Sequence, residues 1–169
     1  MIKIAVTDAC IFIDLFDLEL VASFFQLELE IHTTSAVYYE LYTEQQKVLT
    51  AYKLDSLLVI HNLKEADFNE IHATSYPISL SEADKSVLHI ANKLNACVLS
   101  SDKVVRNCAK NKDIEYHGMI WIFDQLVDSG TITKQEAATK LKQLVQTNRI
   151  FQNNEPLVSE IEKRLKLWI

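Results

Sequence analysis

The chain has 169 residues, of which 49% are hydrophobic, so it is long enough to bury the core of a single domain. Its formal net charge of −6 excludes bulk attraction to polyanions, so a nucleic acid could bind only through a local basic patch or through bound cations. The only two glycines are Gly118 and Gly130. Nucleotide-binding loops that need closely spaced glycines are therefore excluded.

Three cysteines, Cys10, Cys97 and Cys108, lack the spacing of a zinc site or of a disulfide framework. Cys10 and Cys97 lie in apolar runs, and we predict that both are small core residues. A reducing cytoplasm fits this pattern. The N-terminus turns polar too soon for a signal peptide, and no run reaches the ~18 apolar residues of a membrane span, so we expect a cytoplasmic protein with no membrane association.

In chain order, a short apolar strand is predicted over residues 2–6, followed by a buried helix over 9–16. Helical residues continue to 25, and alternation of apolar and polar residues over 27–32 predicts a second strand. Caps at 33–35 open a long predicted helix over 36–52, which places Glu40 in its first turns. A third strand over 57–63, expected towards an edge, leads to a charged helix over 64–74.

The central stretch, residues 80–103, has the clearest signals. Ser81 and Asp84 form a capping box at the start of a helix that ends at Asn95. The apolar run 96–99 predicts a buried strand, and Ser100, Ser101 and Asp102 follow it at once. The next helix begins in a basic run of Lys103, Arg106 and Lys110.

The last part of the chain continues the alternation. Residues 114–117 predict a fifth strand and 119–127 a helix, with Gly130 ending that region. Thr133 with Glu136 forms a second capping box, opening a helix to about 146, and a last helix runs from Pro156 to 167. Strands that alternate with helices predict an α/β fold with a parallel sheet covered on both faces.

Two acids follow predicted strands: Asp8 after the first and Asp102 after the fourth. Since carboxyl ends of parallel strands share one edge, we expect these side chains to meet, with Asp84 and Glu40 near the same edge. Taken singly, Asp8 and Asp102 could be helix caps, Asp84 a capping-box partner and Glu40 a solvated residue. Together they would repel one another, which a divalent cation would relieve, and hard oxygen ligands suit Mg²⁺ or Mn²⁺.

Other site chemistries have less support. The histidines are scattered along the chain and are interpreted as structural or surface residues, not as a zinc set: His32, His61, His72, His89 and His117. Ser100 and Ser101 have no paired base for serine hydrolysis. A phosphatase with an aspartate nucleophile at Asp8 is disfavoured, because Cys10 stands where a second aspartate is expected.

Five segments together resemble the PIN-domain proteins, a family of metal-dependent nucleases: TDACIFIDL at 7–15, VYYEL at 37–41, EADKSVLHIA at 82–91, VLSSDKVVRNCA at 98–109 and EYHGMIWIFDQL at 115–126. The resemblance implies a three-layer α/β/α sandwich around a parallel, about five-stranded sheet. It assigns residues 1–130 to a PIN-like nuclease domain. Residues 131–169 resemble the C-terminal helical extension, packed on the same domain, of a longer bacterial and archaeal branch.

The resemblance also implies a site. By position, the four family acids that act in catalysis and hold Mg²⁺ or Mn²⁺ correspond to Asp8, Glu40, Asp84 and Asp102. Glu82 is a neighbour that could substitute as a metal ligand, and Ser101 takes the small hydroxyl position that can position water or substrate. Cys10 departs from the family pattern, which has a polar residue such as Ser or Asn there, and a thiol donates only weakly to Asp8.

The implied activity is that of an endoribonuclease that hydrolyses phosphodiester bonds and leaves 5′-phosphate and 3′-hydroxyl ends. We expect RNA as the partner, with Lys103, Arg106 and Lys110 contacting its phosphates from one helix face. One alternative is the toxin of a toxin–antitoxin pair, held in check by a small protein. Another is a non-catalytic interaction module, whose last helix would be a docking surface or the seam of a homodimer.

Overall fold

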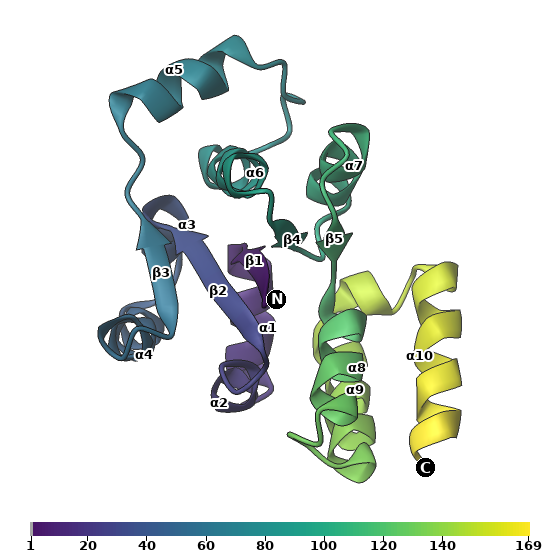
Figure 1. The fold of residues 1–169 in the computed structure, drawn as a ribbon. Helices are drawn as coiled ribbons and strands as arrows, with labels where there is room; N and C mark the ends of the chain where they lie inside the picture. The colour runs from purple at the N-terminus through teal and green to yellow at the C-terminus, as the bar shows by residue number, and fades with distance from the viewer. Residues whose placement is uncertain (1) are drawn as a thin grey trace. The chain divides into compact units, whose positions relative to one another are not determined.

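The computed structural model describes residues 2–169 and is built on one five-stranded sheet, shown in Figure 1. Every strand pair in it is parallel, and the strand order is β3-β2-β1-β4-β5. The strands are β1 (Lys3–Thr7), β2 (Leu29–Thr34), β3 (Leu58–His61), β4 (Cys97–Leu99) and β5 (Tyr116–His117). The predicted parallel α/β sheet is therefore confirmed, and the third strand lies at an edge as expected.

The helices alternate with the strands in the first part of the chain and follow one another after β5. They are α1 (Ala9–Asp17), α2 (Val21–Phe24), α3 (Ser35–Glu40), α4 (Thr43–Leu54), α5 (Glu65–Ala73), α6 (Glu82–Leu94), α7 (Lys103–Asn111), α8 (Met119–Asp128), α9 (Lys134–Thr147), the 3₁₀ helix η1 (Arg149–Phe151) and α10 (Glu155–Trp168). The chain divides into two compact units. The first comprises Met1–Ile13 and Glu28–Gly118, and the second Asp14–Leu27 and Met119–Ile169.

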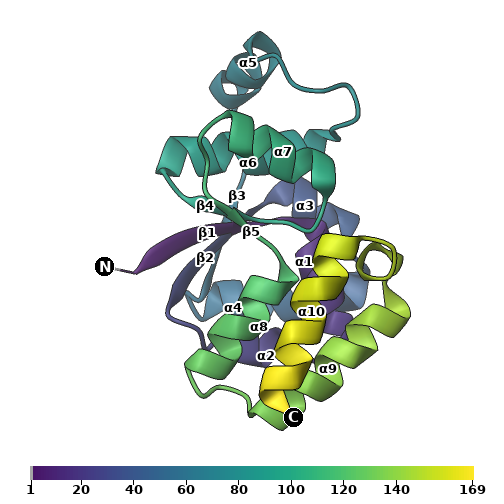
Figure 2. The same cartoon turned by 90° about the vertical axis from the view of Figure 1, so that its right-hand side faces the viewer.

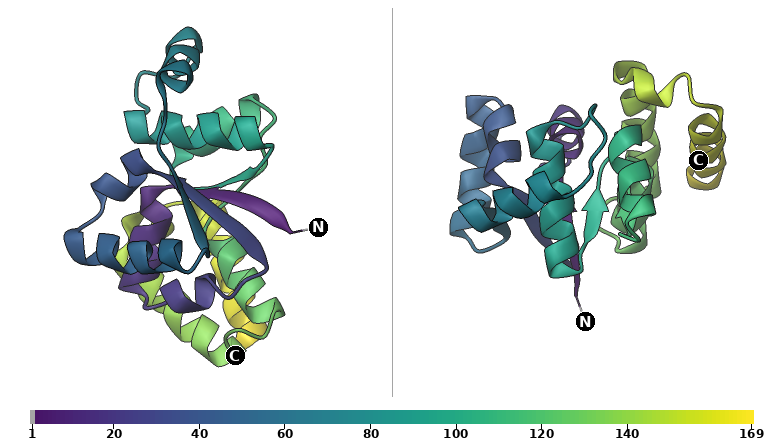
Figure 3. Two further views of the ribbon diagram at one scale, coloured as in Figure 1. Left: turned by 60° about the vertical axis from the view of Figure 1, so that its left-hand side comes forward. Right: turned by 90° about the horizontal axis from the view of Figure 1, so that it is seen from above.

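The first unit holds the whole sheet. Figure 2 shows α6 and α7 on one face of the sheet and α4 on the other, which gives the three layers of the predicted sandwich. Strand β4 and the last three residues of β1 are almost inaccessible to solvent, in keeping with the apolar runs that form them. Helix α5 packs against α6 on the side away from the sheet (Figure 3, left).

The helix α6 begins as its sequence predicts. The Ser81 hydroxyl accepts a hydrogen bond from the Asp84 N–H, and the Asp84 carboxylate accepts one from the Ser81 N–H, both at 3.1 Å. Asn95 ends the helix in the left-handed conformation (φ 53°), which asparagine tolerates better than most residues. Because strand β4 begins two residues later, these caps fix where the polypeptide enters the sheet.

The long helix predicted over residues 36–52 is wrong: the chain breaks at Leu41 into two helices, α3 and α4. Leu41 is extended (ψ 158°) and buries its side chain. Side chains that follow satisfy the backbone at the break, since Gln45 Oε1 accepts from the Tyr42 N–H at 3.0 Å and Gln46 Nε2 donates to the Leu41 carbonyl at 3.0 Å. Glu40 is therefore the last residue of a short helix.

The second unit is helical. Helices α9 and α10 lie side by side (Figure 3, right), and Arg164 of α10 makes a two-nitrogen contact with the Asp124 carboxylate of α8. The 3₁₀ turn η1 between α9 and α10, which the sequence did not predict, buries Phe151. In the structure, α8 and the helices after it share one compact unit. The division at residue 130 that the family resemblance implies stays a prediction.

Candidate metal and nuclease site

The order of the strands places two acids side by side. The chain runs from β1 to β3 in one direction and then adds β4 and β5 on the other side of β1. The switch point is therefore between β1 and β4, and ligands of open α/β sheets bind at such a point, outside the carboxyl ends of the strands. Asp8 follows β1 and Asp102 lies three residues after the end of β4, at this carboxyl edge of the sheet.

Asp8 is held rigidly at the switch point. Its N–H donates to the Leu99 carbonyl of β4 at 3.1 Å, and its Oδ1 accepts from the Ile11 N–H at 3.2 Å, which caps α1. The side chain is 97% buried, being only 3% exposed. Burial, and to a smaller degree the charge of Asp84, raises the pKa of Asp8 from 3.8 to about 6.

Cys10 lies beside this carboxylate, and its Sγ donates to Asp8 Oδ1 at 2.9 Å. Burial and the neighbouring carboxylate raise the pKa of the thiol well above its usual value, so it stays protonated and can donate. Cys10 is half-buried rather than a core residue, which corrects the sequence prediction, whereas Cys97 is buried in the core as expected. The hydrogen bond to Asp8 is formed despite the weak donor.

Ser100 links the two strand-end acids, a role that sequence reasoning missed. It is fully buried, and its Oγ accepts from the Asp102 N–H at 3.1 Å. A hydrogen bond from Ser100 to Asp8 also favours the ionised carboxylate. The position of Ser100 directly after a buried strand can be recognised in the sequence. Its partner Asp8, however, lies 92 residues earlier in the chain.

Glu40 and Asp84 reach the same edge from two helices that pack together, α3 and α6. The packing is anchored by Thr34 Oγ1 and Ser86 Oγ, which are 2.8 Å apart. The pKa of Glu40 is raised, first by partial burial and then by the charge of Asp84. The charge of Asp84 contributes to the raised pKa of both Asp8 and Glu40, so the Asp84 carboxylate repels the other two.

Helix capping and site formation use the same carboxylates. The capping bonds employ one oxygen of each: Oδ1 of Asp8, Oδ2 of Asp84, and Oδ1 of Asp102, which accepts from the Val104 and Val105 N–H groups at 2.8 and 3.1 Å. The capping interpretation of each acid is thus correct. It does not compete with ligand binding, because a carboxylate has a second oxygen and spare lone pairs.

The donor set suits a hard divalent cation. Ser101 Oγ is one of two buried side-chain oxygen or nitrogen atoms of residues 2–169 that have no hydrogen-bond partner, and such an atom is costly unless a ligand or water pairs with it. Within the same residues, no three Asp, Glu, His or Cys side chains are close enough to enclose a metal. Mg²⁺ uses few protein carboxylates and keeps several waters, so a pair of strand-end carboxylates with a free hydroxyl beside them still fits it.

The remaining predicted site residues are paired with other groups or stay exposed. Glu82 begins α6 and pairs with Lys85 at 3.1 Å. Arg106 Nη1 donates to the Ser100 carbonyl at 3.2 Å, and its guanidinium stacks over Tyr116 at 5.1 Å. A Cβ at Gly118 would lie 2.5 Å from that nitrogen, so the glycine makes room for it. Of the predicted phosphate contacts, the side chains that stay exposed are Lys103 and Lys110.

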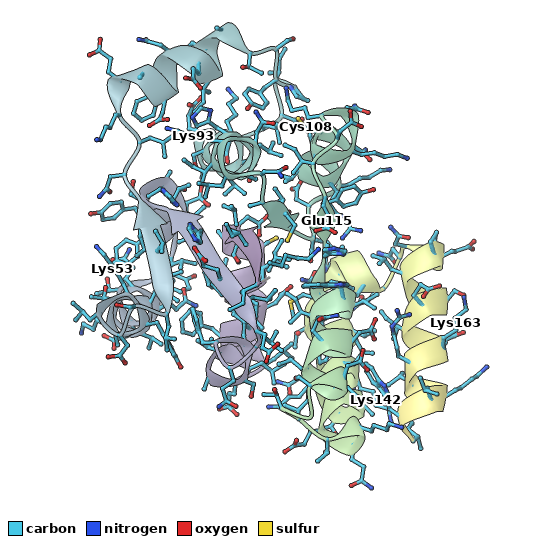
Figure 4. The ribbon with its side chains drawn as sticks, in the orientation of Figure 1. Lys53, Lys93, Cys108, Glu115, Lys142 and Lys163 are labelled. Atoms are coloured by element: carbon cyan, nitrogen blue, oxygen red, sulfur yellow. The ribbon has the colours of Figure 1, made fainter. Side chains whose placement is uncertain are left out.

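Polar contacts hold most of the histidines, in line with the structural role predicted for them, and His117 Nε2 lies 3.6 Å from Glu115 Oε1. His32 Nδ1 lies 2.8 Å from His61 Nε2, and His89 Nε2 lies 2.8 Å from Asp67 Oδ1. Lys93, labelled on α6 in Figure 4, also contacts this aspartate at 3.1 Å. The two contacts of Asp67 tie α5 to α6, and the contact of His32 with His61 joins β2 to β3.

Comparison with known proteins identifies the fold. The family model described as "DUF3368: PIN domain" matches residues 4–166. The PilT N-terminus domain protein SSO1118 from the hyperthermophilic archaeon Sulfolobus solfataricus P2 has a similar structure, with a TM-score of 0.50 and 16% identity over 74% of this chain and 94% of that one. No curated protein sequence matches the chain. No helix within residues 2–169 is long and apolar enough to cross a membrane. Because the family match covers nearly the whole chain, the protein belongs to the PIN-domain family.

Proposed function

We propose that this protein is a metal-dependent nuclease, and more narrowly an endoribonuclease that uses Mg²⁺ or Mn²⁺. Membership of the PIN-domain family supports a nuclease in general terms. The observation that carries the proposal is the meeting of Asp8 and Asp102 at the carboxyl ends of β1 and β4, where the buried Ser100 bonds to both. Burial, with a smaller contribution from the charge of Asp84, raises the pKa of both Asp8 and Glu40. Such crowding is unfavourable until a cation binds.

In this proposal Asp8, Glu40, Asp84 and Asp102 hold the cation, with Glu82 as a possible substitute. When bound, the cation lowers the pKa of water and offsets negative charge on the phosphoryl oxygens. Cys10 and the Ile11 N–H orient the Asp8 carboxylate, and the Ser81 cap orients that of Asp84. These contacts hold the ligands before substrate arrives, which reduces the reorganisation needed in the transition state.

The buried Ser101 hydroxyl is the group that we assign to the water or to a phosphate oxygen. It has an unused donor among the described residues, and it lies next to Asp102 in the chain. Water attacks the phosphorus in line, the bond from phosphorus to the 3′ oxygen breaks, and the departing oxygen takes up a proton. The products would carry a 5′-phosphate and a 3′-hydroxyl.

The decisive experiment is degradation of structured and unstructured RNAs with Mn²⁺, comparing the wild type with Asp8→Asn and Asp102→Asn. We expect both variants to lose activity while keeping the wild-type circular dichroism spectrum. Asp55→Asn is the matched control, because Asp55 is exposed and ends α4 at its far end from Glu40.

Activity that survives in both site variants would refute the proposal. Failure of the wild type to bind Mn²⁺ in calorimetry would instead favour the non-catalytic interaction module. An antitoxin partner stays a separate prediction, for which growth arrest on expression is the test.

A further inference from the structure

Two exposed aromatic residues flank one of the proposed metal ligands in the chain. Tyr39 and Tyr42 are 74% and 80% exposed, and Glu40 lies between them at the end of α3. Leaving two large rings in water forgoes the stabilisation that their burial would bring. Exposed aromatic rings beside a phosphodiester-cleaving site offer a surface for the flat faces of bases.

The Tyr39 ring packs against a neighbouring tyrosine that is itself held in place. The Tyr38 hydroxyl lies 2.9 Å from Thr50 Oγ1, which attaches that ring to α4. The Tyr39 ring packs edge-on against Tyr38, with centroids 5.2 Å apart and planes at 86°. An aromatic pair of this geometry is favourable, so the outer ring is held in place.

Tyr42 is fixed by the helix break. Its backbone is extended (φ −66°, ψ 153°), and its N–H donates to Gln45 Oε1 at 3.0 Å at the start of α4. The backbone around Glu40 is therefore ordered on both sides, by the end of α3 and by the start of α4. Both rings project from this junction, because neither is buried by it.

Electrostatics also favours contacts with bases over contacts with phosphates. The chain carries a net charge of −6, and the carboxyl edge is lined by acids. Several basic groups around this edge are engaged, since Lys85 pairs with Glu82, Lys47 pairs with Glu44, and Arg106 is bonded to the Ser100 carbonyl. Lys103, next to Asp102 in the chain, stays exposed. A nucleic acid approaching this edge gains little from counterion release, so other contacts must supply affinity.

We propose that Tyr39 and Tyr42 form a stacking site for unpaired nucleobases of the substrate strand, next to the scissile phosphate. This inference rests on the proposed nuclease function. In a duplex, each base is paired through its edge and its faces are covered by the neighbouring bases. The two rings therefore select single-stranded segments. Tyrosine stacks on any base, and the site therefore discriminates by strandedness and not by sequence.

The test is steady-state cleavage of a short unstructured RNA with Mn²⁺ by the wild type and by the double variant Tyr39→Ala/Tyr42→Ala. We expect KM to rise by about tenfold or more with kcat little changed, since stacking is made in the ground state and the transition state alike. The double variant Tyr39→Phe/Tyr42→Phe keeps both ring faces and should keep the wild-type KM. Leu54→Ala is the matched control, because this residue is 78% exposed at the far end of α4.

A second measurement separates bases from the backbone. A strand of the same length with abasic positions should compete equally well for the wild type and for the alanine variant, and the slope of log KM against log salt should be the same in both. An unchanged KM in the alanine variant, with the wild type active, overturns the stacking site and leaves the nuclease proposal intact. An abasic strand that competes more tightly for the wild type than for the alanine variant also overturns the stacking site. If the wild type cleaves no RNA, the nuclease proposal fails first.

Discussion

Replacing Asp8 by asparagine should stabilise the metal-free protein, although Asp8 is at the centre of the proposed site. The carboxylate is 97% buried at the switch point of the sheet, and its pKa is raised from 3.8 to about 6. Below about pH 4 the group is protonated in both the folded and the unfolded chain, and ionisation costs nothing. Between about pH 4 and 6 only the unfolded chain ionises fully, so the free energy of unfolding falls as pH rises.

The size of the effect follows from the two pKa values. A rise from 3.8 to about 6 corresponds to about 3 kcal/mol at neutral pH, at roughly 1.4 kcal/mol per pH unit. Asparagine keeps an oxygen that can accept from Cys10 Sγ and from the Ile11 N–H, and it caps a helix about as well as aspartate. We therefore expect the variant to gain up to about 3 kcal/mol, or roughly 6–12 °C in Tm for a chain of this size.

Thermal unfolding followed by circular dichroism in EDTA, at about pH 7.5 and about pH 4, measures this gain. The variant should melt higher than the wild type at the upper pH and close to it at the lower one. Added Mn²⁺ should raise the Tm of the wild type and leave that of the variant unchanged. If Asp8→Asn melts at or below the wild-type temperature in EDTA at both pH values, the buried Asp8 charge does not destabilise the metal-free fold and the reasoning is refuted.

Three further changes test separate contacts. Cys10→Ala should weaken Mn²⁺ binding by about tenfold in calorimetry, because the aspartate after β1 loses an orienting donor, and Cys10→Ser should restore it. Asp67→Asn should lower the free energy of urea unfolding by about 2 kcal/mol near pH 7, since this carboxylate accepts from His89. Hydrogen bonds from the Lys64 N–H, His89 and Lys93 hold the pKa of Asp67 below its usual value, so the difference should shrink progressively as pH falls below about 4. Arg164→Lys should cost about 1 kcal/mol in the same assay, because lysine cannot make the two-nitrogen contact with Asp124.

Much of the fold could be predicted because its boundaries are local signals. Ser81 with Asp84 and Thr133 with Glu136 form the capping boxes that their spacing predicts, since a cap joins residues three apart. The strands followed from short apolar runs between such caps. The break at Leu41 was missed because its new helix start uses tyrosine and glutamine, which are not among the usual capping residues.

The site could be predicted only in part, because its details depend on contacts between distant residues. Strand order brings Ser100 to Asp8, and no local pattern shows this hydrogen bond. Arg106 looked like a free basic residue on a helix face, yet it bonds to the Ser100 carbonyl beside Gly118. Cys10 resembled a core residue by its apolar neighbours, and its role as a donor emerged only with the carboxylate beside it.

The double use of the acids as caps and as proposed ligands means that alanine scanning would mislead. Asp84→Ala or Asp102→Ala would remove a charge and a helix cap together, at about 1 kcal/mol for the cap alone. Loss of activity could then reflect a displaced α6 or α7 and not a missing ligand. Asparagine separates the two roles, because it accepts the same N–H bonds without carrying charge. A site made of caps should therefore lose Mn²⁺ binding in both the asparagine and the alanine variants, whereas a merely structural role should lose it only in alanine.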